Sequence, residues 1–242
     1  MSNVQSVFKR VEKKYMVNET QYHKLMQRFE GRMQVDKYGK TTICNIYYDT
    51  PSHQLIRNSL EKPVYKEKLR VRSYGTPDED GRVFVELKKK YKGVVYKRRV
   101  DMTLAQSRSF MRGAGAPSVN PQIENEISYF LDFYKGIAPA MFLSYERIAL
   151  CGVKNPDLRV TFDSRITYRE EELSLEKGVW GKQLLEPGHM IMEIKIPGAM
   201  PLWLSEILDE LKIFPTTFSK YGTAYMRECK NELKSGKVID CA

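Results

Sequence analysis

The segment at residues 65–74, YKEKLRVRSY, alternates basic side chains with side chains of other kinds. At the two-residue period of a β-strand, one face of this segment carries the cations Lys66, Lys68, Arg70 and Arg72. Like charges in a row on one strand face repel one another unless water or anions separate them. The segment is therefore predicted to be a strand whose charged face meets either solvent or an anionic ligand.

Other predicted strands repeat this one-sided design, with an apolar face and a face that is mostly basic with a few carboxylates. Their charged sets are Arg10, Glu12 and Lys14; Glu86, Lys88 and Lys90; Arg159, Thr161, Asp163 and Arg165; Glu193 and Lys195; and Tyr145 with Arg147. Two architectures fit. In an open sheet the charged face meets water, whereas in a closed barrel helices cover the apolar outside and the charged faces line the lumen. The barrel would form a basic tunnel suited to a polyanion.

The order of the predicted elements favours an antiparallel sheet combined with helices. Strands are expected at residues 7–17, 42–50, 64–74, 82–91, 94–101, 140–151, 157–168 and 189–196. Helices are expected after the capping residues Asn18, Thr103 and Asn120, after Pro51 and Pro201, and near Thr223. The class is therefore α+β, as one domain over residues 1–242 that ends in a tail of roughly ten residues.

Charge and cysteine content limit the partners and the compartment. Lysine and arginine number 40 against 30 aspartates and glutamates, and the net charge of +10 favours acidic partners such as nucleotides, polyphosphate, nucleic acid or anionic lipid. The four cysteines form no C-x-x-C pair, which argues against zinc and against a disulfide framework and favours a reducing compartment. No signal peptide is visible, and no apolar run approaches the ~20 residues of a membrane span. We expect a cytoplasmic protein that reaches a membrane only through a partner or a surface.

Several kinds of catalytic chemistry lack a sequence signal. The three histidines are isolated, and no H-E-x-x-H, G-x-S-x-G or dinucleotide-binding fingerprint occurs. Nucleophilic, zinc and hydride chemistry are therefore not expected. Phosphoryl transfer instead needs cations at the phosphate oxygens, a metal ion and in-line placement of the reactants. Arginine and lysine, which bind phosphate in different ways, are both abundant in this chain.

Five motifs, in order along residues 7–225, resemble the VTC domain, the polyphosphate polymerase branch of the triphosphate tunnel metalloenzymes (the CYTH superfamily). They are Glu12-Lys13-Lys14-Tyr15, the segment YKEKLRVR at residues 65–72, Val85-Glu86-Leu87-Lys88, Met192-Glu193-Ile194-Lys195 and Phe218-Ser219-Lys220-Tyr221-Gly222. The resemblance implies an α+β fold in which an eight-stranded antiparallel barrel forms a tunnel and helices pack outside. It also implies an ATP-dependent transferase whose partners are ATP and inorganic polyphosphate.

The resemblance further implies a role for each matching residue. Arg70, Arg72 and Lys88 would be the catalytic cations on the nucleotide triphosphate. Glu193 would ligate Mn²⁺ or Mg²⁺, and Glu12 would either join it or pair with a neighbouring cation. The other phosphate-binding residues would be Lys14, Lys68, Tyr145, Arg147, Lys195, Ser219 and Lys220. One cation of the run Lys97, Arg98 and Arg99 would join them; the alternation of side chains does not say which one, and we take Arg98.

One departure from the superfamily pattern bears on the reaction. The first strand of the superfamily carries Glu-x-Glu-x-Lys, whereas this chain has Arg10 in place of the first glutamate, before Glu12 and Lys14. Fewer carboxylates should weaken a two-metal hydrolytic site, which favours the polymerase branch. Eukaryotic relatives add an SPX sensor domain and membrane segments that are not visible here, so an unidentified membrane partner is one expectation.

Three functions remain open, of which a polymerase that moves the γ-phosphate of ATP onto polyphosphate is preferred. The second is a tripolyphosphatase or nucleoside triphosphatase on the same fold. The third is a non-catalytic module that binds polyphosphate or RNA. RNA binding would require aromatic side chains for base stacking beside the cations. Tyr65 and Tyr74 are not expected to form such a cluster, so nucleic acid is not an expected partner.

Overall fold

The computed structural model describes residues 10–92, 94–115 and 120–234. The start of the first expected strand and nearly all of the expected C-terminal tail lie outside these ranges. The chain forms two compact units. Unit 1 consists of Met1–Thr41, Tyr145–Ile166 and Leu185–Phe218, and unit 2 consists of Thr42–Ser144, Thr167–Leu184 and Ser219–Ala242. The expected single domain therefore stays a prediction.

The strands belong to one antiparallel sheet that contains eight long strands and two short ones. The long strands are β1 (Arg10–Asn18), β2 (Met33–Asp49), β3 (Tyr65–Tyr74), β4 (Arg82–Tyr91), β5 (Val94–Thr103), β6 (Ala138–Gly152), β7 (Arg159–Arg169) and β9 (His189–Pro197). The short ones are β8 (Lys182–Gln183) and β10 (Pro215–Thr216). The α+β class is confirmed.

The expected closed barrel of eight strands is wrong in two respects. The strand order is β10-β1-β9-β7-β6-β2-β3-β4-β5 with β8 beside β7, so within the described residues the ends β10 and β5 do not pair and the strands number ten. Alternation of side chains reports which face of a strand is apolar, but it says nothing about whether two sheet edges join. In the edge strand β10, moreover, Pro215 has no N–H to donate to a further strand.

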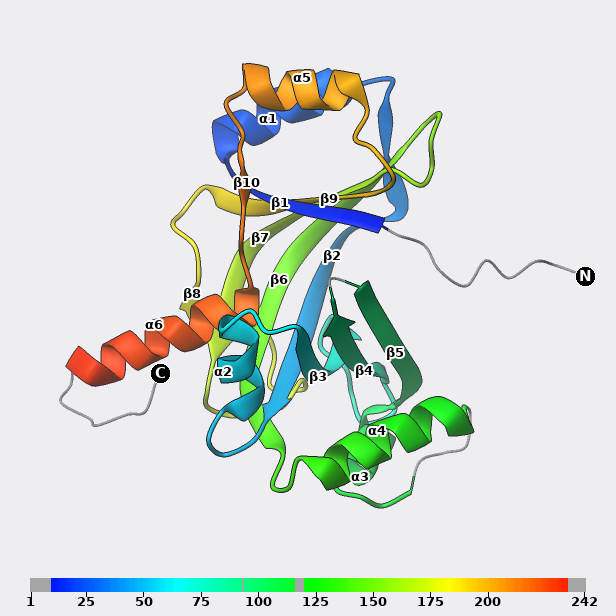
Figure 1. Cartoon of the computed structure of the whole chain (residues 1–242), viewed down its shortest axis with the longest axis vertical. Helices are drawn as coiled ribbons and strands as arrows, with labels where there is room; N and C mark the ends of the chain where they lie inside the picture. The colour runs from blue at the N-terminus through cyan, green and yellow to red at the C-terminus, as the bar shows by residue number, and fades with distance from the viewer. Residues whose placement is uncertain (1–9, 93, 116–119, 235–242) are drawn as a thin grey trace, which may run out of the picture. The chain divides into compact units, whose positions relative to one another are not determined.

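Unit 1 buries the apolar face of β1 and β9 under two helices. The two strands pair from Arg10↔Pro197 to Asn18↔His189, and their buried side chains pack with those of α1 (Glu19–Phe29) and α5 (Leu202–Glu210). The helix expected after Asn18 is confirmed, and Asn18 forms a capping box with Gln21 at the start of α1. Figure 1 shows α1 beside α5, and Arg28 of α1 forms a 2.7 Å ion pair with Glu210 of α5.

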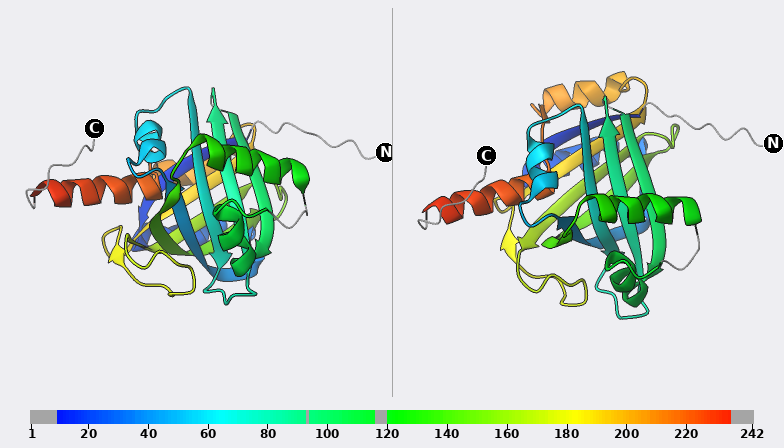
Figure 2. Two further views of the ribbon diagram at one scale, coloured as in Figure 1. Left: turned by 90° about the horizontal axis from the view of Figure 1, so that it is seen from below. Right: turned by 60° about the horizontal axis from the view of Figure 1, so that its bottom comes forward.

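Unit 2 buries the apolar face of β3, β4 and β5 under α3 (Leu104–Met111) and α4 (Pro121–Phe133). Leu69, Val85 and Val100 of the three strands belong to one core with Phe110 of α3 and, from α4, Ile127 and Phe130. Figure 2 shows the three strands side by side with α4 crossing one face. The other face of these strands is therefore left without helical cover from α3 and α4.

The buried carboxylate of Asp49 anchors two further helices of unit 2. It accepts hydrogen bonds from the backbone N–H groups of Leu55 and Ile56 in α2 (Gln54–Leu60) and from the hydroxyl of Tyr221 in α6 (Lys220–Lys234). The helix expected after Pro51 is thus confirmed. The last helix begins at Lys220, slightly earlier than the expected start near Thr223.

Two remaining expectations concern membranes and cysteines. Within the described ranges no helix combines the length and the apolar character that crossing a bilayer requires. Cys44 and Cys151 are free, as expected, but Cys229 is disulfide-bonded, so the chain is not without disulfides.

Candidate functional site

The cations of unit 2 gather on the face of β3, β4 and β5 that α3 and α4 leave uncovered. The register pairs Lys68 with Lys88 and Arg70 with Glu86 across β3 and β4. It pairs Glu86 with Arg99 across β4 and β5. Directly opposed residues of an antiparallel pair lie on the same face. The charged face predicted from alternation in β3 and β4 is therefore one continuous face in three strands.

Glu86 is the buried centre of this face and is surrounded by four cations. Its Oε2 accepts from Arg70 Nε at 2.8 Å and Nη2 at 2.6 Å, and lies 3.8 Å from Arg72 Nε. Its Oε1 accepts from Lys97 Nζ at 2.7 Å and from Arg99 Nη2 at 2.5 Å. Burial alone would raise the pKa of Glu86, but the surrounding cations hold it far below the usual range. One carboxylate against four cations leaves this cluster, which we call the Glu86 cluster, with an excess of positive charge.

Neighbouring side chains fix the arginines and one lysine of this face in place. Arg70 Nη1 donates to the hydroxyl of Tyr47 at 3.1 Å, and Arg72 Nε donates to Asn45 Oδ1 at 3.0 Å. Tyr47 and Asn45 stand opposite these two arginines in the pairing of β2 with β3. Lys68 Nζ donates to Ser219 Oγ at 3.1 Å, which brings together two residues predicted to bind phosphate. These hydrogen bonds hold the basic side chains in fixed positions on the charged face.

Two groups at the Glu86 cluster titrate close to neutral pH. Burial lowers the pKa of Lys97 to about 8, because desolvation outweighs the attraction of Glu86. Burial would raise the pKa of Tyr47, but the charges of Arg70, Lys68 and Arg72 outweigh it and lower the pKa to about 8. The positive charge of this face therefore decreases as the pH rises through 8.

Arg98 lies apart from the Glu86 cluster. It pairs with Leu87 in the register of β4 and β5, which places it on the helix-covered face. Its Nε donates to Glu126 of α4 at 2.9 Å. A phosphate-binding role for Arg98 stays a prediction, and Lys97 and Arg99 are the two cations of that run that reach Glu86.

The charged face of unit 1 brings together the predicted residues of β1 and β9. The register opposes Glu12 to Lys195 and Lys14 to Glu193. Lys195 Nζ lies 2.8 Å from Glu193 Oε1, whereas Lys14 Nζ donates to the carbonyl of Phe218 at 3.0 Å and is 3.9 Å from Glu12. Among the described side chains Glu12 has a loose ionic contact with Lys14, and Glu193 is held by an ion pair with Lys195.

Arg147 is fixed on the same unit by a two-point contact with a buried carboxylate. Its Nε and Nη2 donate to the two oxygens of Asp163 at 2.6 and 2.7 Å, and its guanidinium lies 5.1 Å from the centre of the Tyr145 ring. Burial would lower the pKa of Arg147, but Tyr145 and the carboxylates of Asp163 and Glu193 raise it. Arg147 thus stays charged throughout the physiological pH range, and both carboxylate oxygens of Asp163 accept hydrogen bonds from it.

Glu193 and Glu12 are the residues that could hold a divalent metal ion. Within the described ranges, no three His, Cys, Asp or Glu side chains are grouped as a metal site would require. A Mg²⁺-type ion is bound by one or two carboxylates and completed by water and phosphate oxygens, so two glutamates fit a metal that arrives with a phosphate ligand. Thr161 stands opposite Glu193 in β7 and β9, and its buried hydroxyl has no hydrogen-bond partner among the described residues. The sequence placed Thr161 on this face but gave no signal for a role.

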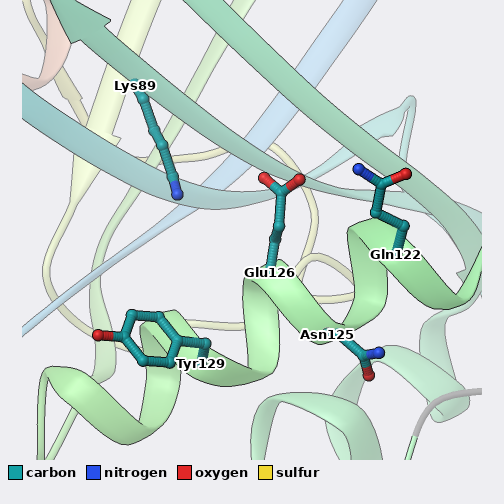
Figure 3. Close-up of a pocket in the computed structure, with 5 residues that line it drawn as sticks. All are labelled: Lys89, Gln122, Asn125, Glu126 and Tyr129. Carbon is teal, nitrogen blue, oxygen red and sulfur yellow. The ribbon is translucent and has the colours of Figure 1, made fainter.

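A shallow groove occurs elsewhere on unit 2, on the helix-covered side of β4. It is lined by Lys89, Gln122, Asn125, Glu126 and Tyr129. Figure 3 shows Lys89 pointing from the strand toward the side of α4 that carries Glu126 and Tyr129. Lys89 lies two residues after Leu87 and therefore on the same face of β4, which is opposite to the face of Glu86. The groove thus opens on the face opposite the Glu86 cluster. Its single lysine and mostly uncharged lining make it a weaker candidate for binding phosphate.

The sequence model described as the VTC domain matches residues 9–227. No curated protein matches the chain. Among solved structures, a putative adenylate cyclase from Bacillus halodurans is 14% identical with a TM-score of 0.53, covering 87% of this chain and 93% of its own. A putative adenylyl cyclase from Hippeastrum, described as having a dominant triphosphatase activity, is 15% identical with a TM-score of 0.52, covering 96% of this chain and 98% of its own. At these identities the two structures show a shared fold.

Proposed function

Because the chain belongs to the VTC domain family, we propose that it is a polyphosphate polymerase that uses ATP and releases ADP. The observation that carries the proposal is the Glu86 cluster, in which four cations on one sheet face surround a single buried carboxylate. Such a face attracts a highly charged anion and stays positive after Glu86 has been neutralised. A triphosphate and a polyphosphate chain are both anions of this kind.

The reaction would exchange one phosphoric anhydride bond for another. A terminal oxygen of polyphosphate forms a bond with the γ-phosphorus of ATP, while the bond from that phosphorus to the β–γ bridging oxygen breaks. The electron pair of the broken bond stays with ADP. Negative charge on the transferred group and the leaving oxygen is stabilised by Arg70 and Arg72, with Lys88, Lys97 and Arg99 adding charge on the same face.

The residues of unit 1 would bind phosphate groups and the metal ion. Glu193, joined by Glu12, would hold Mn²⁺ or Mg²⁺, which would neutralise phosphate charge when bound. The residues proposed to contact phosphate in addition to the Glu86 cluster are Lys14, Lys68, Tyr145, Arg147, Lys195, Ser219 and Lys220. The cytoplasmic location and the identity of the metal stay predictions.

Hydrolysis is the second candidate, because the Hippeastrum protein that shares the fold is described by a dominant triphosphatase activity. The same cations would then stabilise transfer of phosphate to water. Arg10, which stands where the superfamily carries the first glutamate of its first strand, reduces the number of carboxylates and favours transfer over two-metal hydrolysis.

The test is a mass balance on the purified chain with ATP and Mn²⁺. A polymerase releases ADP in excess over free phosphate, and the missing phosphate is recovered in long chains. ADP matched by an equal amount of free phosphate would establish hydrolysis instead. Tight binding of polyphosphate with no ADP formed would establish a binding module.

A further inference from the structure

The end of the β3–β4–β5 sheet carries six large apolar side chains that are about half exposed. They are Val64, Tyr65, Tyr91, Val94, Val95 and Tyr96, and each is between 45% and 62% exposed. The register opposes Tyr65 to Tyr91 and Tyr91 to Val94, and the N–H of Lys92 donates to the carbonyl of Val64 at 3.0 Å. The six side chains therefore lie together at one end of these strands, which we call the hairpin tip. Val95, which stands opposite Lys90, is on the other face of the sheet from Tyr65, Tyr91, Val94 and Tyr96.

Lysines surround the hairpin tip. Lys62, Lys88, Lys90 and Lys92 are exposed beside it, and Lys66 and Lys89 are half-buried. Burial lowers the pKa of Lys66, and the nearby charges of Lys90, Lys88 and Lys62 lower it further, which reflects how densely the cations are placed. Glu61 and Glu67 are the acidic residues of these segments, and Glu67 is buried, where it accepts a hydrogen bond from Tyr134. The tip is thus apolar at its end and strongly basic around it.

The combination of side chains distinguishes the kinds of partner. Protein interfaces are depleted in lysine, so a second protein fits this surface poorly. Polyphosphate would use the lysines but not the valines and tyrosines. The Tyr65 and Tyr91 rings meet edge to face at 6.5 Å, on the face opposite Lys66, Lys88 and Lys90, which does not suit stacking of bases beside cations. A bilayer with anionic headgroups fits both the apolar end of the tip and the lysines around it. Tyrosine favours the membrane interface, and the aliphatic part of a lysine side chain can lie in apolar surroundings while its ammonium group contacts lipid phosphate.

We propose that the hairpin tip docks unit 2 on the surface of an anionic lipid bilayer. Val64, Val94 and Val95 enter the interfacial region, the tyrosines lie at the level of the headgroups, and the ring of lysines contacts lipid phosphate. Docking of this kind requires no membrane-spanning segment. Lys88 belongs both to this surface and to the proposed polymerase site, but the two proposals are tested separately, because polymerase activity can be measured in solution without lipid.

The test is cosedimentation of the full chain with vesicles of phosphatidylcholine, with and without phosphatidylserine. Binding only to the phosphatidylserine vesicles is expected. The double variant Val94→Ser/Val95→Ser should bind these vesicles about tenfold or more weakly, because it removes apolar surface from the tip. Val35→Ser/Val153→Ser is a matched control, since these valines of unit 1 are exposed to the same degree, at 48% each. The control should bind as the wild type does.

Charge reversal separates lipid docking from simple attraction to anions. Lys90→Glu/Lys92→Glu should also abolish vesicle binding. Added tripolyphosphate should not restore vesicle binding by the valine variant. The proposal is overturned by equal binding to both kinds of vesicle, by no binding, or by full binding of the valine variant. Self-association in solution that the valine variant abolishes, without vesicle binding, would assign the tip to a second copy of the chain.

Discussion

Arg70 and Glu86 stand directly opposite each other in β3 and β4, and two nitrogens of the guanidinium donate to one carboxylate oxygen at 2.6 and 2.8 Å. Arg70 is therefore held on the charged face, and the carboxylate that holds it is shared with Arg72, Lys97 and Arg99. The stability of this face and its proposed affinity for anions would thus be coupled through one buried side chain.

Glu86→Gln should destabilise the protein by about 3 kcal/mol, because it leaves the buried Arg72 and three partly exposed cations without their shared counter-charge. The measurement is urea unfolding at neutral pH. Glu126→Gln is the matched control, since Glu126 pairs with one arginine, is more exposed, and should cost much less. Added tripolyphosphate should restore more stability to Glu86→Gln than to the control, because the anion replaces the lost charge. Equal stability of the two variants would contradict the central role of Glu86.

Arg99→Ala and Arg98→Ala compare two adjacent residues of β5 that point to opposite faces. Each arginine pairs with one glutamate and is exposed to a similar degree, 35% for Arg99 and 37% for Arg98. Arg99→Ala should lower kcat/KM for ATP by about a hundredfold, as expected when one preorganised donor is removed. Arg98→Ala should retain nearly full activity. Equal losses in both variants would contradict the assignment of the faces.

The pH dependence of triphosphate binding should follow Lys97 and Tyr47. As the pH rises through about 8, Lys97 loses its charge and Tyr47 gains one, so affinity should weaken. The measurement is calorimetric titration with tripolyphosphate between pH 7 and pH 9. In Lys97→Arg combined with Tyr47→Phe, neither group titrates in this range, and the weakening should largely disappear.

Stability should change in the opposite direction. Both groups have a folded-state pKa below the unfolded value, so the folded state binds fewer protons than the unfolded state between about pH 8 and pH 10. Their contribution therefore favours folding as the pH rises through this range. The pH slope of the free energy of unfolding should be smaller in the double variant than in the wild type. An unchanged slope would contradict these titrations.

Glu193→Gln should abolish the dependence of activity on metal together with the activity itself. Glu12→Gln should retain activity but need more Mn²⁺ if Glu12 is a second ligand, and it should behave as the wild type if Glu12 only pairs with Lys14. Direct titration with Mn²⁺ and tripolyphosphate reports binding apart from turnover. A fully active, metal-stimulated Glu193→Gln variant would remove Glu193 from the site.

Thr161→Val should separate stability from function. The buried hydroxyl has no partner among the described residues, so replacing it with a methyl group should leave the protein equally stable or raise its stability by about 1 kcal/mol. If the hydroxyl serves a bound metal or phosphate beside Glu193, the same variant should bind tripolyphosphate with Mn²⁺ more weakly. A variant with unchanged affinity would show that Thr161 has no part in binding.

Much of the charged face could be predicted because strand geometry fixes the period of side chains. In residues 69–72 of β3 and 85–88 of β4 an apolar residue alternates with a charged one, so the face of Arg70, Arg72 and Lys88 follows directly from the sequence. In β5 the run Lys97-Arg98-Arg99 contains no apolar residue that would show which side chains face the core. Only the pairing of β5 with β4 shows which of these cations lie on the face of Glu86.

Other features depend on pairings that a single sequence does not reveal. Tyr47 and Asn45 lie in a segment that is apolar overall, and they contribute to the face only because β2 pairs with β3 at Arg70 and Arg72. Strand β2 begins at Met33, earlier than the expected start at Thr42. The sequence did not predict this earlier start, because the residues between Met33 and Thr42 are mostly polar and show no clear alternation. Closure of the sheet, likewise, depends on its edges and not on its faces.

The measurement that tests the central claim most directly is the fate of the γ-phosphate. ATP labelled at that phosphorus is incubated with the wild type, Arg99→Ala and Arg98→Ala, and the products are separated on a gel. The account predicts label in long chains for the wild type and Arg98→Ala, and almost none for Arg99→Ala. Label recovered only as free phosphate, or in equal chains from all three proteins, would contradict it.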